Sequence, residues 1–422
     1  MRVGLIGDPL GHSFSPRLHA AFGTADYELH PIPAEALPAF FRERAFEGVN
    51  VTIPHKIAVI PLLDELHPSA EECGAVNTVV NRGGKLTGYN TDIFGMSFAL
   101  AHAGISLSGR HVVILGSGGT SHTARALAKR EGAASVTVVS RSGEVNYSNI
   151  AEFTETEIVI NTTPVGMFPH ADASPVDLTV FPRLRGVFDA VFNPLRTRLI
   201  EQAENLGVPV ASGLLMLTAQ AKAASILFRG GDYSEPSPAS EVGAEILNVW
   251  REVTAELTNI VLIGMPSSGK TTVGTLLAER LRRPLIDTDA ETERRTGKTV
   301  PELFAEGGEE NFRREERLTV SECARGTGVI IATGGGAPMF PENRAALAGN
   351  GFVVLILRDT EKLDTAGRPL SRDLDTLKAM YKVRMPVYKA FADAEAVNND
   401  TPSACAELIL EKFYENFGHQ RS

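Results

Sequence analysis

The stretch GMPSSGKTT, which starts at Gly264, has the residue types and spacing of a loop that holds phosphate groups. Such a loop directs backbone N–H groups at the phosphates, and its lysine adds a positive charge. An apolar run, NIVLIG, precedes it and a helical pattern, VGTLLAERL, follows it, which is the context that the motif requires. A threonine hydroxyl after the lysine suits Mg²⁺. The predicted nucleotide-binding residues are Gly264, Gly269, Lys270, Thr271 and Thr272.

Three further clusters follow this loop. LIDTD places Asp287 and Asp289 at the end of a strand, where one carboxylate could hold hydrated Mg²⁺ and the other accept a hydroxyl proton. FRREE supplies Arg313, whose guanidinium fork suits a substrate carboxylate. ATGGGAP contains three glycines, which allow the backbone to approach a ligand closely. Taken alone, each cluster also fits a solvated surface or a plain turn.

The first half of the chain contains a second glycine turn, in HVVILGSGGTSHTARALA. Its position between a strand and a helix predicts dinucleotide binding by Gly116, Gly118 and Gly119, although Ser121 replaces the third glycine of the usual pattern. The next strand ends at Ser140-Arg141, where an NAD enzyme usually has an acid. An arginine there suits a 2′-phosphate, so the sequence favours NADP.

Polar residues also interrupt the apolar strands upstream. Lys56 and Asp92 can exchange a proton with an alcohol while hydride moves to or from its carbon. The surrounding hydroxyls and amides predict a pocket for a small molecule with many hydroxyl groups. Each residue alone also fits a capped turn. The set lies in GHSFSP, NVTIPHK, GAVNT and GYNTD, and comprises Ser13, Ser15, Thr52, Lys56, Asn77, Asn90 and Asp92.

Alternating strands and helices must position these groups. Apolar runs such as VGLIG, HVVILGSGG, NIVLIG and FVVLIL alternate with helical patterns, which predicts α/β architecture with parallel sheets. The turn-rich stretch 230–238 breaks the alternation, and an amphipathic helix at 240–256 follows it. A strand opens at Asn259, so we expect a domain boundary near residue 257.

Composition narrows the class of protein. The 422 residues carry 41 Lys and Arg against 51 Asp and Glu, and this net charge of −10 makes nucleic acid an unlikely partner. Three cysteines without CxxC spacing argue against a disulfide framework and a zinc site. The sequence has no run of about 18 apolar residues and no apolar signal-peptide core. We therefore expect a cytoplasmic protein that does not span a membrane.

The second half resembles shikimate kinase over residues 257–422, through its phosphate loop, DTD, FRREE, TGGGA, GRPL and YKVRMPVY. The resemblance implies a P-loop, nucleoside-monophosphate-kinase-like parallel-sheet domain with a lid, and ATP and Mg²⁺ as cofactors. It implies that Asp287 binds Mg²⁺ through water and that Asp289 orients the shikimate 3-hydroxyl. The other implied contacts are Arg313 and Arg384 to the substrate carboxylate, Gly335 and Gly336 to the ring, and Arg368 of the lid to the phosphates.

One stretch departs from the kinase pattern. In LRDTEKLDTAGRPL, Asp364 or Thr365 falls where the family usually carries an arginine that packs against adenine. The lid also looks shortened. We therefore expect weakened nucleotide selection.

The first half resembles shikimate dehydrogenase, through GDPLGHSFSP, NVTIPHK, GAVNT, GYNTD, GSGGT, NTTPVGM, DAVFNP and GLLMLTAQA. The resemblance implies residues 1–256 as one enzyme, with a substrate domain at 1–96 plus 231–256 and a Rossmann-type NADP domain at 97–230. Phe192 replaces a tyrosine common in this family, which removes one expected substrate hydrogen bond. The implied roles are catalysis for Lys56 and Asp92, substrate binding for Ser13, Ser15, Thr52, Asn77, Asn90 and Gln220, and NADP binding for Gly116, Gly118, Gly119, Ser140, Arg141 and Met216.

Together the two resemblances imply a bifunctional enzyme of the shikimate pathway. It would reduce 3-dehydroshikimate with NADPH and then phosphorylate shikimate with ATP. The alternative is a quinate or shikimate dehydrogenase joined to a kinase-like half that is weak or only binds ligand. The sequence leaves the oligomeric state open.

Overall fold

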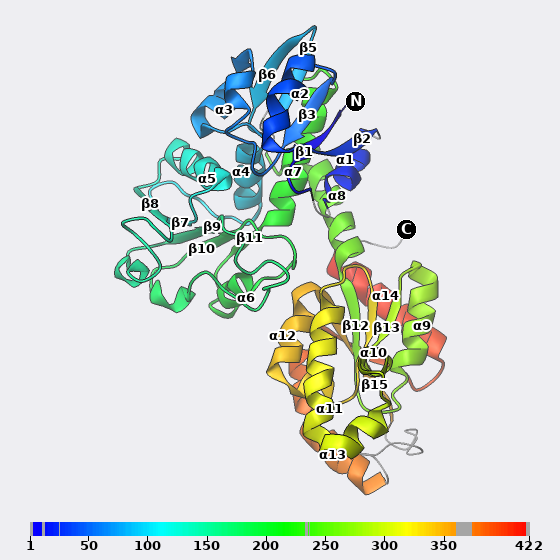
Figure 1. The fold of residues 1–422 in the computed structure, drawn as a ribbon. Helices are drawn as coiled ribbons and strands as arrows, with labels where there is room; N and C mark the ends of the chain where they lie inside the picture. Colours follow the sequence, from blue (N-terminus) through cyan, green and yellow to red (C-terminus); the bar gives the residue numbers. More distant parts are fainter. Residues whose placement is uncertain are drawn as a thin grey trace. The chain divides into compact units, whose positions relative to one another are not determined.

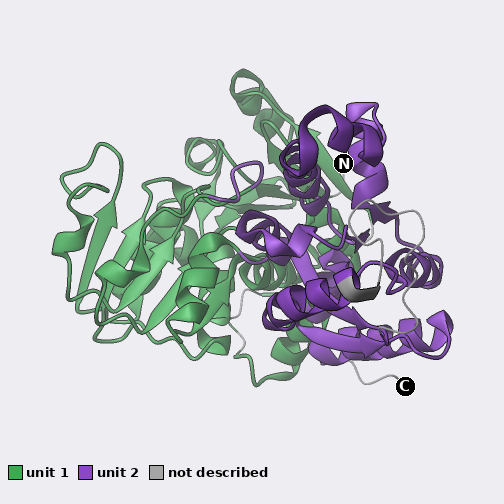
Figure 2. Cartoon of the chain, turned by 90° about the horizontal axis from the view of Figure 1, so that it is seen from below, with its two compact units in different colours: residues 1–167, 173–192, 197–250 green, residues 168–172, 193–196, 251–422 purple. Residues whose placement is uncertain are grey.

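A computed structural model describes residues 3–10, 13–24, 26–232, 235, 237–359 and 374–418. The chain forms two compact units, coloured in Figure 2. Unit 1 comprises residues 1–167, 173–192 and 197–250, and unit 2 comprises 168–172, 193–196 and 251–422. The division falls inside one continuous helix, α8 (Glu241–Leu257), and the next strand begins two residues after that helix ends. The predicted boundary near residue 257 therefore lies at the end of α8.

The first sheet of unit 1 has six strands in the order β2-β1-β3-β5-β6-β4 (Figure 1). Strands β1, β2 and β3 are parallel, whereas β5 is antiparallel to both β3 and β6. The sheet is therefore mixed rather than parallel as predicted. The reason is local: Gly83 and Gly84 have φ of +61° and +88°, which makes a tight hairpin turn between β5 and β6. The bounds are β1 (Val3–Gly7), β2 (Tyr27–Pro31), β3 (Gly48–Val51), β4 (Glu65–Leu66), β5 (Thr78–Arg82), β6 (Lys85–Tyr89), α1 (Ser15–Ala21), α2 (Leu37–Glu43) and α3 (Pro68–Cys73).

The second sheet of unit 1 is fully parallel, with the order β11-β10-β9-β7-β8. Strand β7 lies between β8 and β9. The chain therefore runs from β7 to its neighbour β8 on one side and then crosses to β9 on the other side. In such sheets ligands bind in the crevice beyond the carboxyl ends of the strands at this switch point. The bounds are β7 (His111–Leu115), β8 (Ser135–Val139), β9 (Ile158–Asn161), β10 (Gly186–Asp189), β11 (Val210–Ser212), α4 (Asp92–His102), α5 (Gly119–Arg130), α6 (Arg198–Asn205) and α7 (Gly213–Phe228).

Unit 2 contains one parallel sheet in the order β13-β14-β12-β15-β16. The long helix α11 is interrupted at Gly307 and Gly308, whose backbone is not helical. The bounds are β12 (Asn259–Ile263), β13 (Leu285–Asp287), β14 (Ile330–Ala332), β15 (Gly351–Leu357), β16 (Ala394–Val397), α9 (Lys270–Leu281), α10 (Thr288–Thr296), α11 (Val300–Ala324), α12 (Pro341–Asn350), α13 (Leu374–Phe391) and α14 (Pro402–Asn416).

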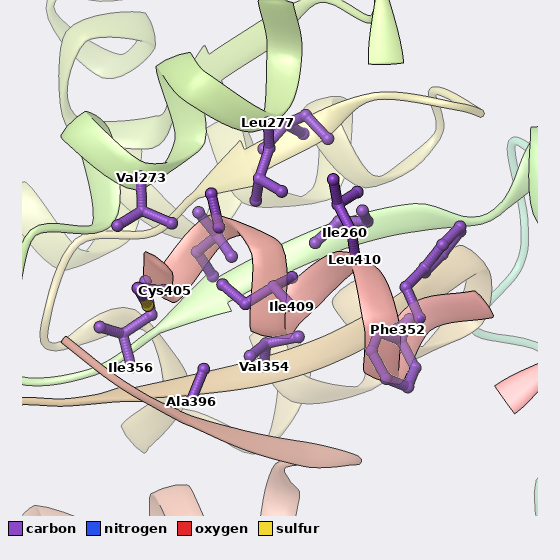
Figure 3. Packing of buried hydrophobic residues seen from close by; sticks show 14 of the residues in the cluster. Ile260, Val273, Leu277, Phe352, Val354, Ile356, Ala396, Cys405, Ile409 and Leu410 are labelled. Carbon is purple, nitrogen blue, oxygen red and sulfur yellow. The ribbon is translucent and has the colours of Figure 1, made fainter. Parts of the chain in front are cut away.

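Alternate residues of β12 face the two sides of this sheet. Ile260 and Leu262 pack with Leu277 of α9 and Ile409 of α14 in one core, shown in Figure 3. Val261 and Ile263 belong to the core on the opposite face, with residues of α11, α12 and α13. Burial on both faces explains why NIVLIG is continuously apolar. No helix among the described residues is long and apolar enough to cross a membrane.

Candidate active sites

Lys56 and Asp92 form an ion pair in unit 1, with 2.5 Å between Nζ and Oδ2. Lys56 lies in the turn after β3, and Asp92 is the first residue of α4. Their side chains are only 15% and 10% exposed, so little water screens the pair. The structure thus brings together the two residues for which the sequence predicts proton transfer.

Asn77 ties this pair to a second set of polar groups. Its Nδ2 donates to Asp92 Oδ1 and to Thr91 Oγ1, both at 2.9 Å, and lies 3.4 Å from Gln220 Oε1. Thr91, which the sequence analysis did not single out, is fully buried and lies 3.3 Å from the same Gln220 oxygen. Lys56 and Asn77 therefore hold the Asp92 carboxylate directly, and Gln220 holds Asn77 and Thr91. The GYNTD motif contained the missed threonine.

Asn90 joins the start of α4 to an upstream segment. It is fully buried, and its amide donates to the Ala75 carbonyl at 2.9 Å. The same side chain accepts from the Ile93 N–H at 3.1 Å. Its predicted contact with a substrate stays a prediction.

The two predicted serines lie where α1 begins. Ser15 is buried, and its N–H donates to Ser13 Oγ at 3.2 Å. The burial of neighbouring Tyr27 raises the pKa of its phenol, and a hydrogen bond with Ser15 opposes that rise. Tyr27 also donates to Asn50 Oδ1 at 2.7 Å. Neither Tyr27 nor Asn50 was predicted, although Asn50 lies within GVNVTIPHK, two residues before Thr52.

His19 extends this buried network. It stacks on the Tyr27 ring with 4.0 Å between centroids, and its Nδ1 lies 3.0 Å from Ser225 Oγ. Burial lowers the pKa of His19 from 6.5 to about 3, against the opposing effect of a hydrogen bond with Asn50. The histidine is therefore neutral at physiological pH and serves packing rather than charge.

The glycine turn of the second sheet follows β7, at the predicted position. Gly116 has φ of +105°, which favours glycine, and a Cβ there would lie 2.8 Å from Thr162 Oγ1. A Cβ at Gly118 would meet no atom within 4 Å, so space remains beside the start of α5. A Cβ at Gly119 would lie 3.5 Å from Cδ of Lys56. The turn therefore adjoins the ion pair.

The remaining predicted dinucleotide residues lie on two further elements. Ser140 and Arg141 follow β8, and Arg141 is exposed. Met216 and Gln220 are buried on α7, which packs against α4 at Gly95. A Cβ at Gly95 would clash with the Met216 carbonyl oxygen. This close approach of the two helices explains how Gln220 reaches the groups around Asp92.

The phosphate loop of unit 2 connects β12 to α9, as predicted. Lys270 Nζ donates to the carbonyl oxygens of Gly264 and Met265, at 3.0 and 2.9 Å. Gly264 and Gly269 have φ of +149° and +95°. A Cβ at Gly264 would lie 2.6 Å from the Ile356 carbonyl oxygen. These glycines are thus required for the chain to wrap the lysine.

Thr271 and Asp287 form a pair of oxygen ligands beside this loop. Thr271 Oγ1 donates to Asp287 Oδ2 at 2.7 Å, and Asp287 Oδ1 accepts from the Asp289 N–H at 3.1 Å. Among the described residues, no group of three or more His, Cys, Asp or Glu side chains could hold a metal. Hydroxyl and carboxylate oxygens nevertheless suit Mg²⁺, which keeps several waters and shares its other positions with substrate phosphates.

The predicted substrate residues of unit 2 surround the three glycines after β14. A Cβ at Gly334 would clash with Asp289 Oδ1 and would lie 2.8 Å from Glu316 Oε1. A Cβ at Gly335 would lie 3.3 Å from an Arg384 terminal nitrogen, and one at Gly336 would clash with the Arg313 guanidinium. The structure therefore gathers Asp289, Arg313 and Arg384 around one backbone segment. Tyr388, which was not predicted, donates to the Gly335 carbonyl.

Arg313 already has two carboxylate partners. Its terminal nitrogens donate to Glu316 at 2.8 Å and to Glu309 at 3.0 Å. Glu316 is fully buried, and burial raises its pKa despite the opposing charge of Arg313. Glu309 has a side chain that is 54% exposed, so it is the partner of Arg313 that solvent can reach. Arg368 and the Asp364 and Thr365 positions of the lid lie outside the described residues.

Comparisons with known proteins cover both halves of the chain. Residues 5–79 match the family model of the shikimate dehydrogenase substrate binding domain, and residues 266–414 match that of shikimate kinase. Shikimate dehydrogenase (NADP(+)) of Symbiobacterium thermophilum is 36% identical over 250 residues, which are 52% of this chain and 85% of that protein. The corresponding enzyme of a Geobacter species is 39% identical over 260 residues, covering 54% of this chain and 89% of that protein.

Solved structures agree with these relatives. The shikimate 5-dehydrogenase of Thermus thermophilus, in complex with NADP(H) and shikimate, has a TM-score of 0.52 and 33% identity. The match covers 60% of this chain and 99% of that one. A chorismate mutase/shikimate 5-dehydrogenase fusion from Clostridium acetobutylicum has a TM-score of 0.54 and 30% identity, over 60% and 96% of the two chains. The chain thus belongs to the shikimate dehydrogenase family, and its C-terminal half carries a shikimate kinase domain.

Proposed function

We propose that this chain catalyses two consecutive reactions. The first is the NADPH-dependent reduction of 3-dehydroshikimate to shikimate. The second is the transfer of a phosphoryl group from ATP to the 3-hydroxyl of shikimate. A dehydrogenase and a kinase domain in one chain support this bifunctional assignment, because the product of the first reaction is the substrate of the second.

In the first site, the Lys56 ammonium is placed to give a proton to the carbonyl oxygen of the substrate. NADPH held at the dinucleotide turn would supply the hydride to the carbonyl carbon, so that the C=O bond would become an alcohol and NADP⁺ would be released. Asp92 orients Lys56 through the 2.5 Å contact, and Asn77 fixes Asp92. This ion pair beside Gly119 is the observation that carries the proposal, since it joins proton transfer to the dinucleotide turn.

The cofactor of this site is proposed to be NADP. Arg141 is exposed at the end of β8 and can pair with a 2′-phosphate. The relatives from Symbiobacterium and Geobacter are named as NADP(+) enzymes. Gly116, Gly118 and Gly119 supply the close backbone approach, and Ser140 and Met216 complete the proposed set.

In the second site, Asp289 is placed to accept the proton of the attacking hydroxyl. The hydroxyl oxygen then bonds to the γ-phosphorus as the bond to ADP breaks. Arg313 and Arg384 are proposed to hold the substrate carboxylate, and Gly335 and Gly336 to line the ring. Lys270 holds the β and γ phosphates, and Mg²⁺ held by Thr271 and, through water, by Asp287 would neutralise their charge.

The direct test is product formation by one purified chain. Given 3-dehydroshikimate, NADPH and Mg²⁺-ATP, the chain should accumulate shikimate 3-phosphate with no second protein. Omitting ATP should stop the reaction at shikimate while NADPH is still oxidised. Failure to oxidise NADPH would refute the first assignment, and failure to form ADP from added shikimate would refute the second.

A further inference from the structure

Arg358 lies directly after β15, beside the phosphate loop of unit 2. Strands β12 and β15 are parallel neighbours, with Ile263 opposite Leu355, so their carboxyl ends lie together. The phosphate loop follows the end of β12, and Arg358 follows the end of β15. Arg358 NH1 donates to the carbonyl oxygen of Ser267, in the middle of the loop, at 3.2 Å.

The charge of Arg358 has no carboxylate partner within ion-pair distance among the described residues, unlike Arg313 and Arg295, which are both paired with glutamates. The adjacent acid, Asp359, instead exchanges hydrogen bonds with Asn399, at 2.9 and 2.8 Å. The Nε of Arg358 is buried and has no hydrogen-bond partner in the part of the chain that the structure describes. Leaving a buried donor unsatisfied is unfavourable, and more so for a charged group. Such a cation beside an anion-binding loop is suited to an anionic ligand.

A second donor holds the loop from the next strand. Asn398, directly after β16, is buried, and its Nδ2 donates to the Ser268 carbonyl oxygen at 2.8 Å. Arg358 and Asn398 therefore bind the carbonyls of two consecutive loop residues. Of these two donors, only Arg358 is charged. Both residues support the loop, but only Arg358 can add an electrostatic contribution to the binding of an anion.

We propose that Arg358 is a nucleotide-binding residue, whose guanidinium holds the Ser267 carbonyl and places a positive charge at the phosphate groups of a nucleoside triphosphate. The inference rests on the proposed kinase function and assigns an additional cation to the same site. Because the contact is to phosphate, its contribution should grow with the number of phosphates on the nucleotide.

The test is a calorimetric titration of the full chain with Mg²⁺ and ATP, ADP or AMP, without shikimate. Arg358→Gln keeps a donor for Ser267 but removes the charge. It should raise the Kd for ATP at least about tenfold, as expected for a charged hydrogen bond, and change the Kd for AMP far less. Arg358→Lys should bind ATP more tightly than Arg358→Gln. Arg280→Gln is the matched control, because Arg280 lies on α9 ten residues beyond Lys270 and pairs with Glu407.

Unchanged ATP binding by Arg358→Gln would overturn the proposal, as would an equal loss for all three nucleotides. Tighter ATP binding by Arg358→Gln than by Arg358→Lys would also contradict it. Retained AMP binding by each variant reports that unit 2 has folded. A wild-type chain that binds no ATP would overturn the kinase function and the role of Arg358 together. Normal wild-type binding with an unaffected Arg358→Gln variant would overturn only the latter.

Discussion

Lys56 of the dehydrogenase site and the two cations beside the phosphate loop of the kinase site have different partners. In the dehydrogenase site, Lys56 is paired with a carboxylate at 2.5 Å, whereas in the kinase site Lys270 and Arg358 donate to backbone carbonyls of the phosphate loop. A lysine that must exchange a proton benefits from a fixed charged partner that orients it. A cation beside a phosphate loop can form a charge-assisted hydrogen bond with its ligand, because phosphate supplies the negative charge.

Removing Lys56 should have the largest effect of these changes, on the rate of the dehydrogenase reaction. Lys56→Ala leaves Asp92 without its cation and deletes the proton donor, and the loss of a general acid typically costs about 10²–10⁴-fold in rate. We expect kcat for 3-dehydroshikimate to fall by that factor, measured by NADPH absorbance. Phosphorylation of added shikimate should be unchanged. A near-normal kcat would show that Lys56 is not the proton donor.

A methyl group at Gly334 should disturb the kinase substrate site without touching the phosphate loop. Its Cβ would clash with Asp289 Oδ1 and would lie 2.8 Å from Glu316 Oε1, and such overpacking costs about 1–3 kcal/mol. Gly334→Ala should therefore lower kcat/KM for shikimate by roughly 10–100-fold, with ATP binding retained. The control is Gly326→Ala, where the Cβ would come no closer than 3.3 Å to a neighbour. Equal kinetics for the two variants would mean that the packing around Asp289 does not matter.

Removing Arg141 tests the charge that the dehydrogenase site offers to its cofactor. Because a hydrogen bond to a charged group contributes about 1.5–3 kcal/mol, Arg141→Ala should raise KM for NADPH about tenfold or more. KM for NADH should hardly change, since NADH lacks the 2′-phosphate. Steady-state kinetics with both cofactors give the answer. Equal effects on both would place Arg141 away from the 2′-phosphate.

The smallest expected effect concerns stability rather than catalysis. The buried His19 has a pKa lowered from 6.5 to about 3, so the folded state takes up its proton less readily than the unfolded state. His19 therefore contributes stability that is present above pH 6.5 and is lost as the pH falls toward 3. Its contribution to the slope is at most about 1.4 kcal/mol per pH unit.

His19→Gln should flatten the pH dependence of unfolding in this range relative to wild type. Urea titrations followed by fluorescence of the single tryptophan, Trp250, measure it, because that residue lies on α8 and contacts His102 of unit 1. His30→Gln is the control, since His30 is partly exposed and lies beside Glu28. Parallel pH profiles for wild type and His19→Gln would contradict the assignment.

Motifs predicted the local structure around both sites well because each motif joins a strand end to a helix start. The turn after β7, the phosphate loop and the LIDTD segment all lie where the alternation of elements predicted. Lys56 and Asp92 are 36 residues apart in sequence, and the structure brings them into contact. The GRPL segment of the lid lies outside the described residues, so its predicted departure from the family pattern stays a prediction.

The sequence did not predict the partners of buried polar side chains. Asn77 and Asn90 both precede strand or helix boundaries, yet the Asn77 side chain contacts Asp92 while the Asn90 side chain bonds to the Ala75 carbonyl and the Ile93 N–H. The buried network of His19, Tyr27 and Asn50 carries no periodic signal, because it joins three separate elements. The β5–β6 hairpin was also missed, although its Gly-Gly turn was visible in the sequence.

We infer that one chain carries two independent catalytic sites, and a coupled assay on two variants checks this independence. Given 3-dehydroshikimate, NADPH and Mg²⁺-ATP, Lys270→Ala should oxidise NADPH at the wild-type rate and stop at shikimate. Lys56→Ala should neither oxidise NADPH nor form shikimate from 3-dehydroshikimate. It should still form ADP when shikimate is added. Sites without shared partners act additively, which predicts this separation. Loss of NADPH oxidation in folded Lys270→Ala would contradict the claim.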